Sequence, residues 1–216
     1  MRVILFGATG MIGRGVLREC LLDGRVTAVL AVGRAPAGVA HGKLREILHD
    51  DLLDLAPVEG ELGGYDACFF CLGVSSAGMR EQDYRRITYD FTLSAGGTLA
   101  RLSPGSTFVY VSGAGADARG RAMWARVKGE TENALLALPL EAYVFRPGYV
   151  QPMHGVRSRT RLYQAAYVIT RPLFPVLRRL VAGGVTTTEQ VGRAMITVAE
   201  RGAAKRILGP ADINAL

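Results

Sequence analysis

Three glycines near the start of the chain have the type and spacing to bind phosphate. The sequence Gly7-Ala8-Thr9-Gly10-Met11-Ile12-Gly13 follows a β-rich run at residues 2–6 and opens a helical pattern at residues 11–22. Glycines here let the backbone approach a pyrophosphate closely, and the helix N-terminus supplies unpaired N–H groups. The spacing alone is weak evidence in a glycine-rich chain, but its placement predicts a dinucleotide-binding turn over an ordinary glycine turn.

Arg34 follows the second predicted strand, residues 26–32, at the position that usually recognises an adenosine ribose. A carboxylate there would accept hydrogen bonds from the ribose 2′-OH, and none is present. A guanidinium suits a 2′-phosphate instead. The sequence therefore predicts that NADP(H) is preferred over NAD(H), with a solvated surface arginine as the alternative.

An acidic pair follows the third predicted strand, in the sequence His49-Asp50-Asp51-Leu52. A carboxylate at this point can receive the adenine amino group, with the leucine beside the ring. Asp51 and Leu52 are the preferred pair, and Asp50 remains open. The same acids could instead cap the next turn.

The apolar residues along the chain alternate between strand-like and helical periodicity. Strands are predicted over residues 2–6, 26–32, 44–48, 66–72, 107–112 and 142–146, and helices over 11–22, 83–102, 124–138 and 187–200. This alternation is typical of βαβ units. We expect an α/β fold, a doubly wound, mostly parallel Rossmann sheet with helices on both faces, in a single domain over residues 1–216.

Residues 147–184 interrupt this alternation with prolines and arginines. In a doubly wound fold this part lies over the carboxyl ends of the strands, so we expect a substrate-side lid or insert. The arginines within 157–181 suit an anionic substrate, a partner protein or an anionic lipid surface, and equally suit ordinary helices with solvated arginines. The next helix is expected to begin at Thr187, with Gln190 three residues on.

The composition is that of a folded domain. The chain has 216 residues, 49% of them hydrophobic, and a formal net charge of +7. No apolar run reaches the roughly 18 residues of a membrane-spanning helix, and the N-terminus lacks the pattern of a secretory signal, so we expect a soluble, cytoplasmic protein. The basic excess is mostly arginine spread along the chain. It reflects either compositional bias or attraction to anionic ligands, and without a recognition motif no nucleic-acid partner is expected.

The cysteines and histidines predict neither a disulfide nor a metal site. Cys68 and Cys71 lie three residues apart on one predicted strand, so their thiols project from opposite faces and are expected to pack in the core. His41, His49 and His154 are scattered without metal-ligand spacing.

Five motifs together resemble the atypical short-chain dehydrogenase/reductase superfamily. They are the glycine turn at 7–13, Asp51-Leu52, Cys71-Leu72-Gly73, Val127-Lys128-Gly129-Glu130 and Phe145-Arg146-Pro147-Gly148. The residues of these motifs are similar to those of Tat-interacting oxidoreductase-like proteins and of bacterial epimerase/dehydratase-like proteins. The resemblance covers nearly the whole chain and is weakest over residues 156–184. It implies that Cys71, Leu72, Gly73, Pro147 and Gly148 also contact the cofactor.

The resemblance also implies a catalytic Tyr-x-x-x-Lys pair with a serine on the preceding strand. Ser112 and Lys128 occupy the serine and lysine positions, but Trp124 stands where the tyrosine belongs. An indole N–H only donates hydrogen bonds and cannot act as general acid or base. Lys128 can still hold the nicotinamide ribose, while Tyr149 and water are alternative proton sources. A strand-end serine, a solvated lysine and a packing tryptophan remain the simpler interpretations.

These observations predict an NADP(H)-binding oxidoreductase-like or epimerase-like protein acting on a small molecule, with an anionic or carbonyl compound as the expected class. The alternative is a catalytically impaired nucleotide-binding regulator or redox sensor that acts through partners. A nucleic-acid or membrane-surface module on the same fold is a third hypothesis.

Overall fold

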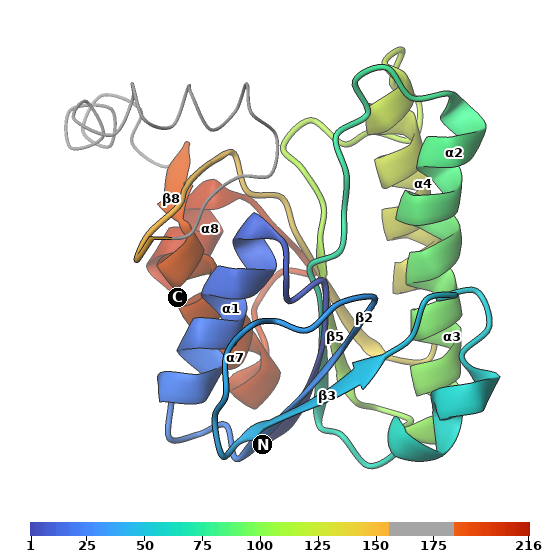
Figure 1. Cartoon of the computed structure of the whole chain (residues 1–216). Helices are drawn as coiled ribbons and strands as arrows, with labels where there is room; N and C mark the ends of the chain where they lie inside the picture. Colours follow the sequence, from blue (N-terminus) through green and yellow to red (C-terminus); the bar gives the residue numbers. More distant parts are fainter. Residues whose placement is uncertain (156–183) are drawn as a thin grey trace.

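A seven-stranded parallel sheet runs through the part of the chain that this computed structural model describes, residues 1–155 and 184–216 (Figure 1). Its strand order is β3-β2-β1-β4-β5-β6-β9, and every neighbouring pair is parallel. The strands are β1 (Arg2–Phe6), β2 (Ala28–Gly33), β3 (Leu44–Leu48), β4 (Ala67–Phe70), β5 (Thr107–Val111), β6 (Glu141–Phe145) and β9 (Ile207–Leu208). The predicted doubly wound α/β fold is confirmed.

Helices cover both faces of this sheet (Figure 1). One layer contains α1 (Met11–Leu22), α7 (Thr188–Arg201) and α8 (Pro210–Ala215), and the opposite layer contains α2 (Glu81–Arg85), α3 (Phe91–Leu102) and α4 (Met123–Leu136). Each layer buries its own apolar core against the sheet. The helices meet the sheet with apolar residues at helical spacing, which is why the periodicity of the sequence locates them.

Strand β4 is buried along its whole length, as expected for a central strand covered on both faces. Cys68 belongs to the core under α3 and α4, whereas Cys71 packs against the core under α1 and α7. Both thiols are free, on opposite faces of the sheet. The prediction that they pack rather than pair is confirmed.

The helix predicted over residues 83–102 is a composite. It consists of α2, a π-helical turn η2 (Arg86–Asp90) and α3, which follow one another without a gap. A π-helical turn widens the backbone spiral by one residue and has no sequence signature strong enough to predict. The turn matters here because two of its residues line the cleft described below.

Three short strands were not predicted. Besides β9, the strands β7 (Tyr149–Gln151) and β8 (Val185–Thr187) pair in parallel as a separate two-stranded sheet. Runs of two or three residues carry too little periodicity to be recognised. The α7 cap is as predicted: the Thr187 hydroxyl accepts a hydrogen bond of 3.0 Å from the Gln190 N–H. Residues 156–183, with the arginines at 157–179, lie outside the described residues, so the lid remains a prediction.

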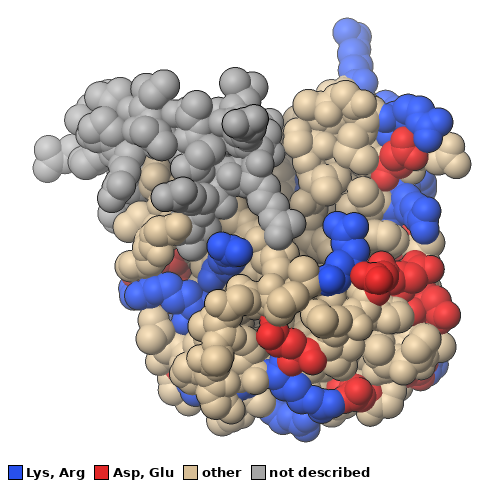
Figure 2. All heavy atoms as spheres, viewed as in Figure 1, with Lys and Arg blue, Asp and Glu red and all other residues tan. Residues whose placement is uncertain are grey.

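Charged side chains are mixed on the molecular surface. On the face drawn in Figure 2, Lys and Arg are scattered among Asp and Glu and form no continuous basic area in the described part. Several arginines pair with acids on neighbouring elements, as Arg101 does with Glu59 and Arg85 with Glu130. In the same described ranges, no helix is both long and apolar enough to cross a bilayer.

Candidate functional site

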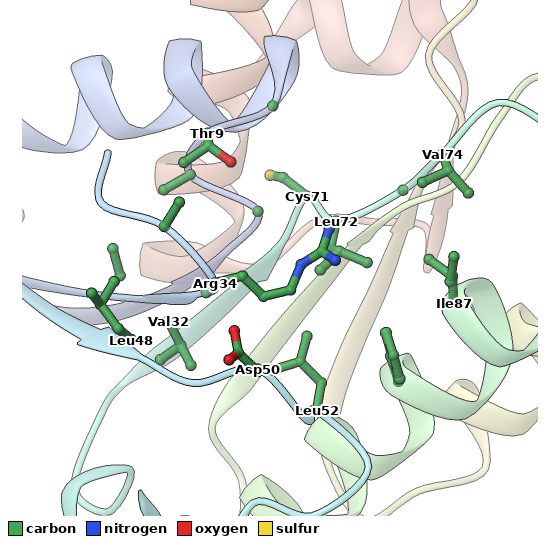
Figure 3. Close-up of a pocket in the computed structure, with 18 of the residues that line it drawn as sticks. Thr9, Val32, Arg34, Leu48, Asp50, Leu52, Cys71, Leu72, Val74 and Ile87 are labelled. Atoms are coloured by element: carbon green, nitrogen blue, oxygen red, sulfur yellow. The ribbon is translucent and has the colours of Figure 1, made fainter. Parts of the chain in front are cut away.

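A cleft of about 990 Å³ opens at the carboxyl ends of β1, β2, β3 and β4 (Figure 3). It lies where the strand order reverses, because β1 pairs with β2 on one side and with β4 on the other. The segments that follow two such strands run to opposite faces of the sheet, and a crevice opens between them. This crevice is the usual ligand site of doubly wound folds.

The glycine turn at residues 7–13 forms one wall of the cleft. Gly7 has a φ of +82°, and a Cβ on it would lie 2.6 Å from the Leu72 backbone nitrogen. A Cβ on Gly13 would lie 2.0 Å from the Gly7 carbonyl oxygen. Backbone contacts therefore require glycine at both positions. Gly7, Ala8, Thr9, Gly10 and Met11 line the cleft, whereas Ile12 and Gly13 lie behind this wall.

Helix α1 begins at this wall without a side-chain cap. Gly10 is the N-cap residue, its own N–H donates to the Gly7 carbonyl at 2.9 Å, and the first turn contains no acidic residue. The first N–H groups of an uncapped helix lack internal partners, and the helix dipole makes this end positive. The arrangement can hold a phosphate group.

Arg34 reaches into the cleft from the end of β2. Figure 3 shows its side chain between Asp50 and Leu52 on one side and Thr9 and Cys71 on the other. The residue is exposed and makes no ion pair with any residue within 1–155 or 184–216. A guanidinium in this position is available to an anionic group.

The acidic pair is divided by the turn after β3. Asp50 and Leu52 line the cleft, but Asp51 does not, because its carboxylate accepts a hydrogen bond of 3.0 Å from the Leu53 N–H. The structure thus places Asp50, rather than the preferred Asp51, beside the cleft. Which of two adjacent acids faces inward depends on the turn geometry, which the sequence leaves open.

The far wall combines predicted residues with unpredicted ones. Cys71, Leu72 and Gly73 lie there as expected. Four residues of the helix after β4 also line the cleft and were missed: Asp83, Arg86, Ile87 and Phe91. The spacing of Ile87 and Phe91, four residues apart, places them on one helix face and was the available signal.

Ser112, Trp124 and Lys128 come together one strand further along, beyond β5. A Cβ on Gly113 would lie 3.8 Å from both Trp124 Cζ3 and Lys128 Cδ, so both side chains cover the loop that begins with Ser112. Gly129 permits this packing, since a Cβ there would lie 2.1 Å from the Ala118 nitrogen. The motif residues therefore meet as the resemblance implies, outside the lining of the 990 Å³ cleft.

A buried carboxylate organises the space behind Ser112. Glu132, 1% exposed, accepts a hydrogen bond from the Ser112 hydroxyl. Arg146 donates to the same carboxylate from Nε, at 3.0 Å to Oε1 and 3.1 Å to Oε2, and from a terminal nitrogen. This pairing raises the pKa of the Arg146 guanidinium. Glu132 was not predicted as a site residue, although it lies four residues after Lys128 on the same helix face.

Within residues 1–155 and 184–216, the polar contacts of Lys128 are all long. Its Nζ lies 3.5 Å from the Tyr110 hydroxyl and 3.5 Å from the Val111 carbonyl oxygen. Burial lowers the pKa of Lys128 to about 8, and the negative charge of Glu132 opposes that shift. Burial also raises the pKa of the neighbouring Tyr110 phenol. The Lys128 ammonium is therefore more acidic than that of an exposed lysine.

Tyr149 and the residues before it stabilise the chain at the edge of the sheet. The Tyr149 hydroxyl donates to Gln151 Oε1 at 2.8 Å, and the Pro147 carbonyl accepts from the Ala114 N–H at 3.3 Å. A Cβ on Gly148 would lie 2.4 Å from the Gly184 carbonyl oxygen. Pro147, Gly148 and Tyr149 do not line the cleft.

One cluster has the composition of a metal site. Ligand atoms of Glu19, His154 and Glu189 lie within 4.8 Å of one another. Arg193 bridges both glutamates, at 3.1 and 2.6 Å, and Arg18 pairs with Glu19 at 2.5 Å. These guanidinium groups already match the carboxylate charges, and they repel a cation.

Comparison with known proteins identifies the family. No family model matches the chain. The chain is 28% identical to protein fmp52 of Emericella nidulans over 203 residues, 90% of this chain and 85% of that protein. It is 30% identical to fmp52-1 of Aspergillus oryzae over 169 residues, 75% of this chain and 70% of that protein. The chain belongs to the fmp52 family.

This fmp52-family chain is also 27% identical to HTATIP2 of Rattus norvegicus over 149 residues, 68% of this chain and 61% of that protein. Its fold matches UDP-N-acetylglucosamine 4-epimerase from Methanobrevibacter ruminantium, with a TM-score of 0.70, 17% identity, and coverage of 95% and 74% of the two chains. It likewise matches DesIV, a dTDP-glucose 4,6-dehydratase from Streptomyces venezuelae, with a TM-score of 0.71 and 18% identity. That match covers 100% of this chain and 79% of the DesIV chain. Membership of the atypical short-chain dehydrogenase/reductase superfamily is confirmed.

The predicted cytoplasmic location is wrong. The fmp52 relatives from Emericella nidulans, Scheffersomyces stipitis and Aspergillus oryzae are named mitochondrial proteins. The absence of a secretory pattern excludes only one class of targeting signal, so it could not support the cytoplasm over another compartment.

Proposed function

We propose that this chain binds a nicotinamide dinucleotide in the cleft, with the pyrophosphate at the N-terminus of α1. The observation that carries the proposal is the close backbone packing at Gly7 and Gly13, which leaves an uncapped helix end facing the cleft. Solved neighbours of the same fold support it: the Bordetella bronchiseptica enzyme WbmF was crystallised in complex with NAD+, and DesIV with NAD bound. When bound, such a cofactor supplies or accepts a hydride.

The adenosine end would lie between β2, β3 and the helix after β4. Leu52, Ile87 and Phe91 offer an apolar lining for the adenine, and Asp50 an acceptor for its amino group. Arg34 lies next to this position without an acidic partner in the described ranges, which supports NADP(H) over NAD(H).

The direct test is calorimetric titration of the whole chain with NADPH and NADH. We expect both to bind and NADPH to bind at least about tenfold more tightly, because a 2′-phosphate paired with a guanidinium contributes a charge-assisted hydrogen bond. Binding of neither nucleotide contradicts the proposal, and equal binding contradicts the preference.

The activity we propose is an oxidoreductase-like or epimerase-like reaction on a small molecule. It is supported by Lys128 and Trp124 covering the loop that begins with Ser112, one strand beyond the cleft, and by neighbours whose names describe epimerases and dehydratases. A screen of carbonyl compounds and nucleotide sugars with NADPH, followed at the nicotinamide absorbance, tests it.

The second candidate is a dinucleotide-binding regulator with little turnover. Trp124 favours it, because the indole fills the position of the general acid and packs on the loop at Gly113 and Gly115. Tight NADPH binding without turnover across the screen would decide for this function.

A further inference from the structure

We propose that Lys128 exchanges the proton of the reaction in place of a tyrosine, and that Glu132 is the positioning residue that prevents Ser112 from doing so. This inference rests on the proposed dinucleotide-dependent activity and deepens it. Lys128 then carries the proton, and Ser112 binds a hydrogen-bond donor of the substrate rather than an acceptor.

The hydrogen bond between Ser112 and Glu132 has a defined direction. A carboxylate accepts hydrogen bonds and cannot donate them unless protonated. Glu132 already accepts three hydrogen bonds from the Arg146 guanidinium, so the two side chains form a hydrogen-bonded ion pair. The hydrogen between Ser112 and Glu132 therefore belongs to the serine.

The consequence for Ser112 is a change of role. A hydroxyl has one hydrogen and two lone pairs, and here the hydrogen is committed to Glu132. Ser112 can then offer only lone pairs to a substrate. It cannot donate to a bare carbonyl oxygen, but it can accept from a substrate hydroxyl or from the Lys128 ammonium.

Trp124 cannot take over the proton transfer, because an indole nitrogen does not ionise near neutral pH. It lies on the same face of α4 as Lys128, and both side chains cover Gly113. Lys128 is therefore an ionisable group that lies over Gly113 beside the Trp124 indole.

The surroundings of Lys128 suit proton exchange. Among the described residues, the groups that act on Lys128 directly are the Tyr110 hydroxyl on β5 and the Glu132 carboxylate on α4. Tyr84 acts in turn on Tyr110, and Arg146, which follows β6 and interacts with Asp117, pairs with Glu132. The charge of Glu132 is engaged by Arg146, so Lys128 has no carboxylate partner of its own among the described residues. Its lowered pKa keeps both protonation states populated near neutrality.

The step balances with one proton and one hydride. In reduction, the carbonyl carbon gains a hydride from the reduced dinucleotide, and the C=O π electrons move to oxygen. The oxygen takes a proton from the Lys128 ammonium, leaving a neutral amine that recovers a proton from water. In oxidation, neutral Lys128 accepts the alcohol proton as the hydride leaves carbon.

The first experiment needs neither cofactor nor turnover. The chain has three lysines, Lys43, Lys128 and Lys205, so ¹³C-dimethylation of the whole protein gives few NMR signals, and Lys128→Arg assigns the one of interest. We expect a titration midpoint near 8. Ser112→Ala keeps the Glu132–Arg146 pair and should leave the midpoint close to that value, while Glu132→Gln should lower it. A Lys128 midpoint above about 10, the range of an unperturbed lysine, overturns the inference.

The second experiment separates the two residues kinetically. Lys128→Arg keeps a positive charge but cannot titrate in this range, so we expect kcat to fall about 100-fold or more with dinucleotide Kd changed only a few-fold. Ser112→Ala should reduce kcat by less than about tenfold, whereas loss of a donor to the reacting oxygen would cost about 100-fold or more.

The two proposals fail in different ways. Absence of dinucleotide binding by the unaltered protein overturns the proposed function, while the NMR titration still decides the protonation of Lys128. Binding and turnover with an unaffected Lys128→Arg variant, or with a Ser112→Ala variant as impaired as a missing donor predicts, overturns the inference and leaves the proposed function standing.

Discussion

The α-carbon of Gly13 faces the carbonyl oxygen of Gly7 so closely that a Cβ would stand 2.0 Å from that oxygen. This contact holds the first turn of α1 against the end of β1. It explains why the third glycine of the motif matters although it does not touch the cleft. The wall of the cleft thus depends on backbone packing behind it.

Gly13→Ala should destabilise the fold by about 1–3 kcal/mol, the usual cost of forcing a methyl group into a packed position. Urea unfolding measures it. Gly24→Ala is the matched control, because Gly24 is exposed and has nothing within 4 Å of its Cβ position. Equal stability of the two variants would contradict the assigned packing role.

Arg34→Ala should weaken NADPH binding about tenfold or more and leave NADH binding nearly unchanged, because only NADPH carries the 2′-phosphate. Calorimetry with both nucleotides checks this. Arg201→Ala serves as control, since Arg201 is exposed at the end of α7 and has no ion pair in residues 1–155 or 184–216. A similar loss for both nucleotides would remove Arg34 from 2′-phosphate recognition.

Arg146→Ala should cost about 3 kcal/mol of stability, because it leaves the buried Glu132 carboxylate without its counter-ion. An exposed pair gives the contrast. Arg80→Ala breaks the Arg80–Asp83 pair, whose side chains are 79% and 46% exposed, and should reduce stability much less than Arg146→Ala does. Denaturant midpoints of the two variants decide, and a difference near zero counts against a buried role for Arg146.

Lys128 should make stability increase with pH between about 8 and 10.5. Its pKa is about 8 in the folded chain against a reference of 10.5, so the unfolded chain binds more protons in this window. Raising the pH releases that proton and favours the folded state. Lys128→Met should remove this contribution, seen as the difference between variant and unaltered protein at the two ends of the window. A constant difference would indicate an unperturbed lysine.

Trp124→Tyr should increase turnover about tenfold or more, because it adds an ionisable phenol four residues before Lys128. Trp124→Phe has similar bulk without the hydroxyl and should show no increase. Initial rates with NADPH and any active carbonyl compound measure the effect. If both variants behave alike, the space beside Trp124 does not admit the reacting oxygen.

Much of the architecture could be predicted because its causes are local. The β4 strand is a continuous apolar run, and the glycine turn stands between a strand and a helix, so both follow from pattern alone. What the sequence leaves open depends on three-dimensional pairing. Asp50 lines the cleft, whereas Asp51 accepts a hydrogen bond from the Leu53 N–H within the turn. The hydrogen-bond network of Glu132 joins Ser112, just after β5, with Arg146, just after β6. These residues are far apart in the sequence, so local sequence patterns do not predict that they meet.

The pairing of β7 with β8 sets Tyr149 opposite Val185 and Gly148 against Gly184. This small sheet ties the segment that follows β6 to the segment that leads into α7. A slip in its register would therefore displace the start of α7 and leave the strand order of the main sheet unchanged.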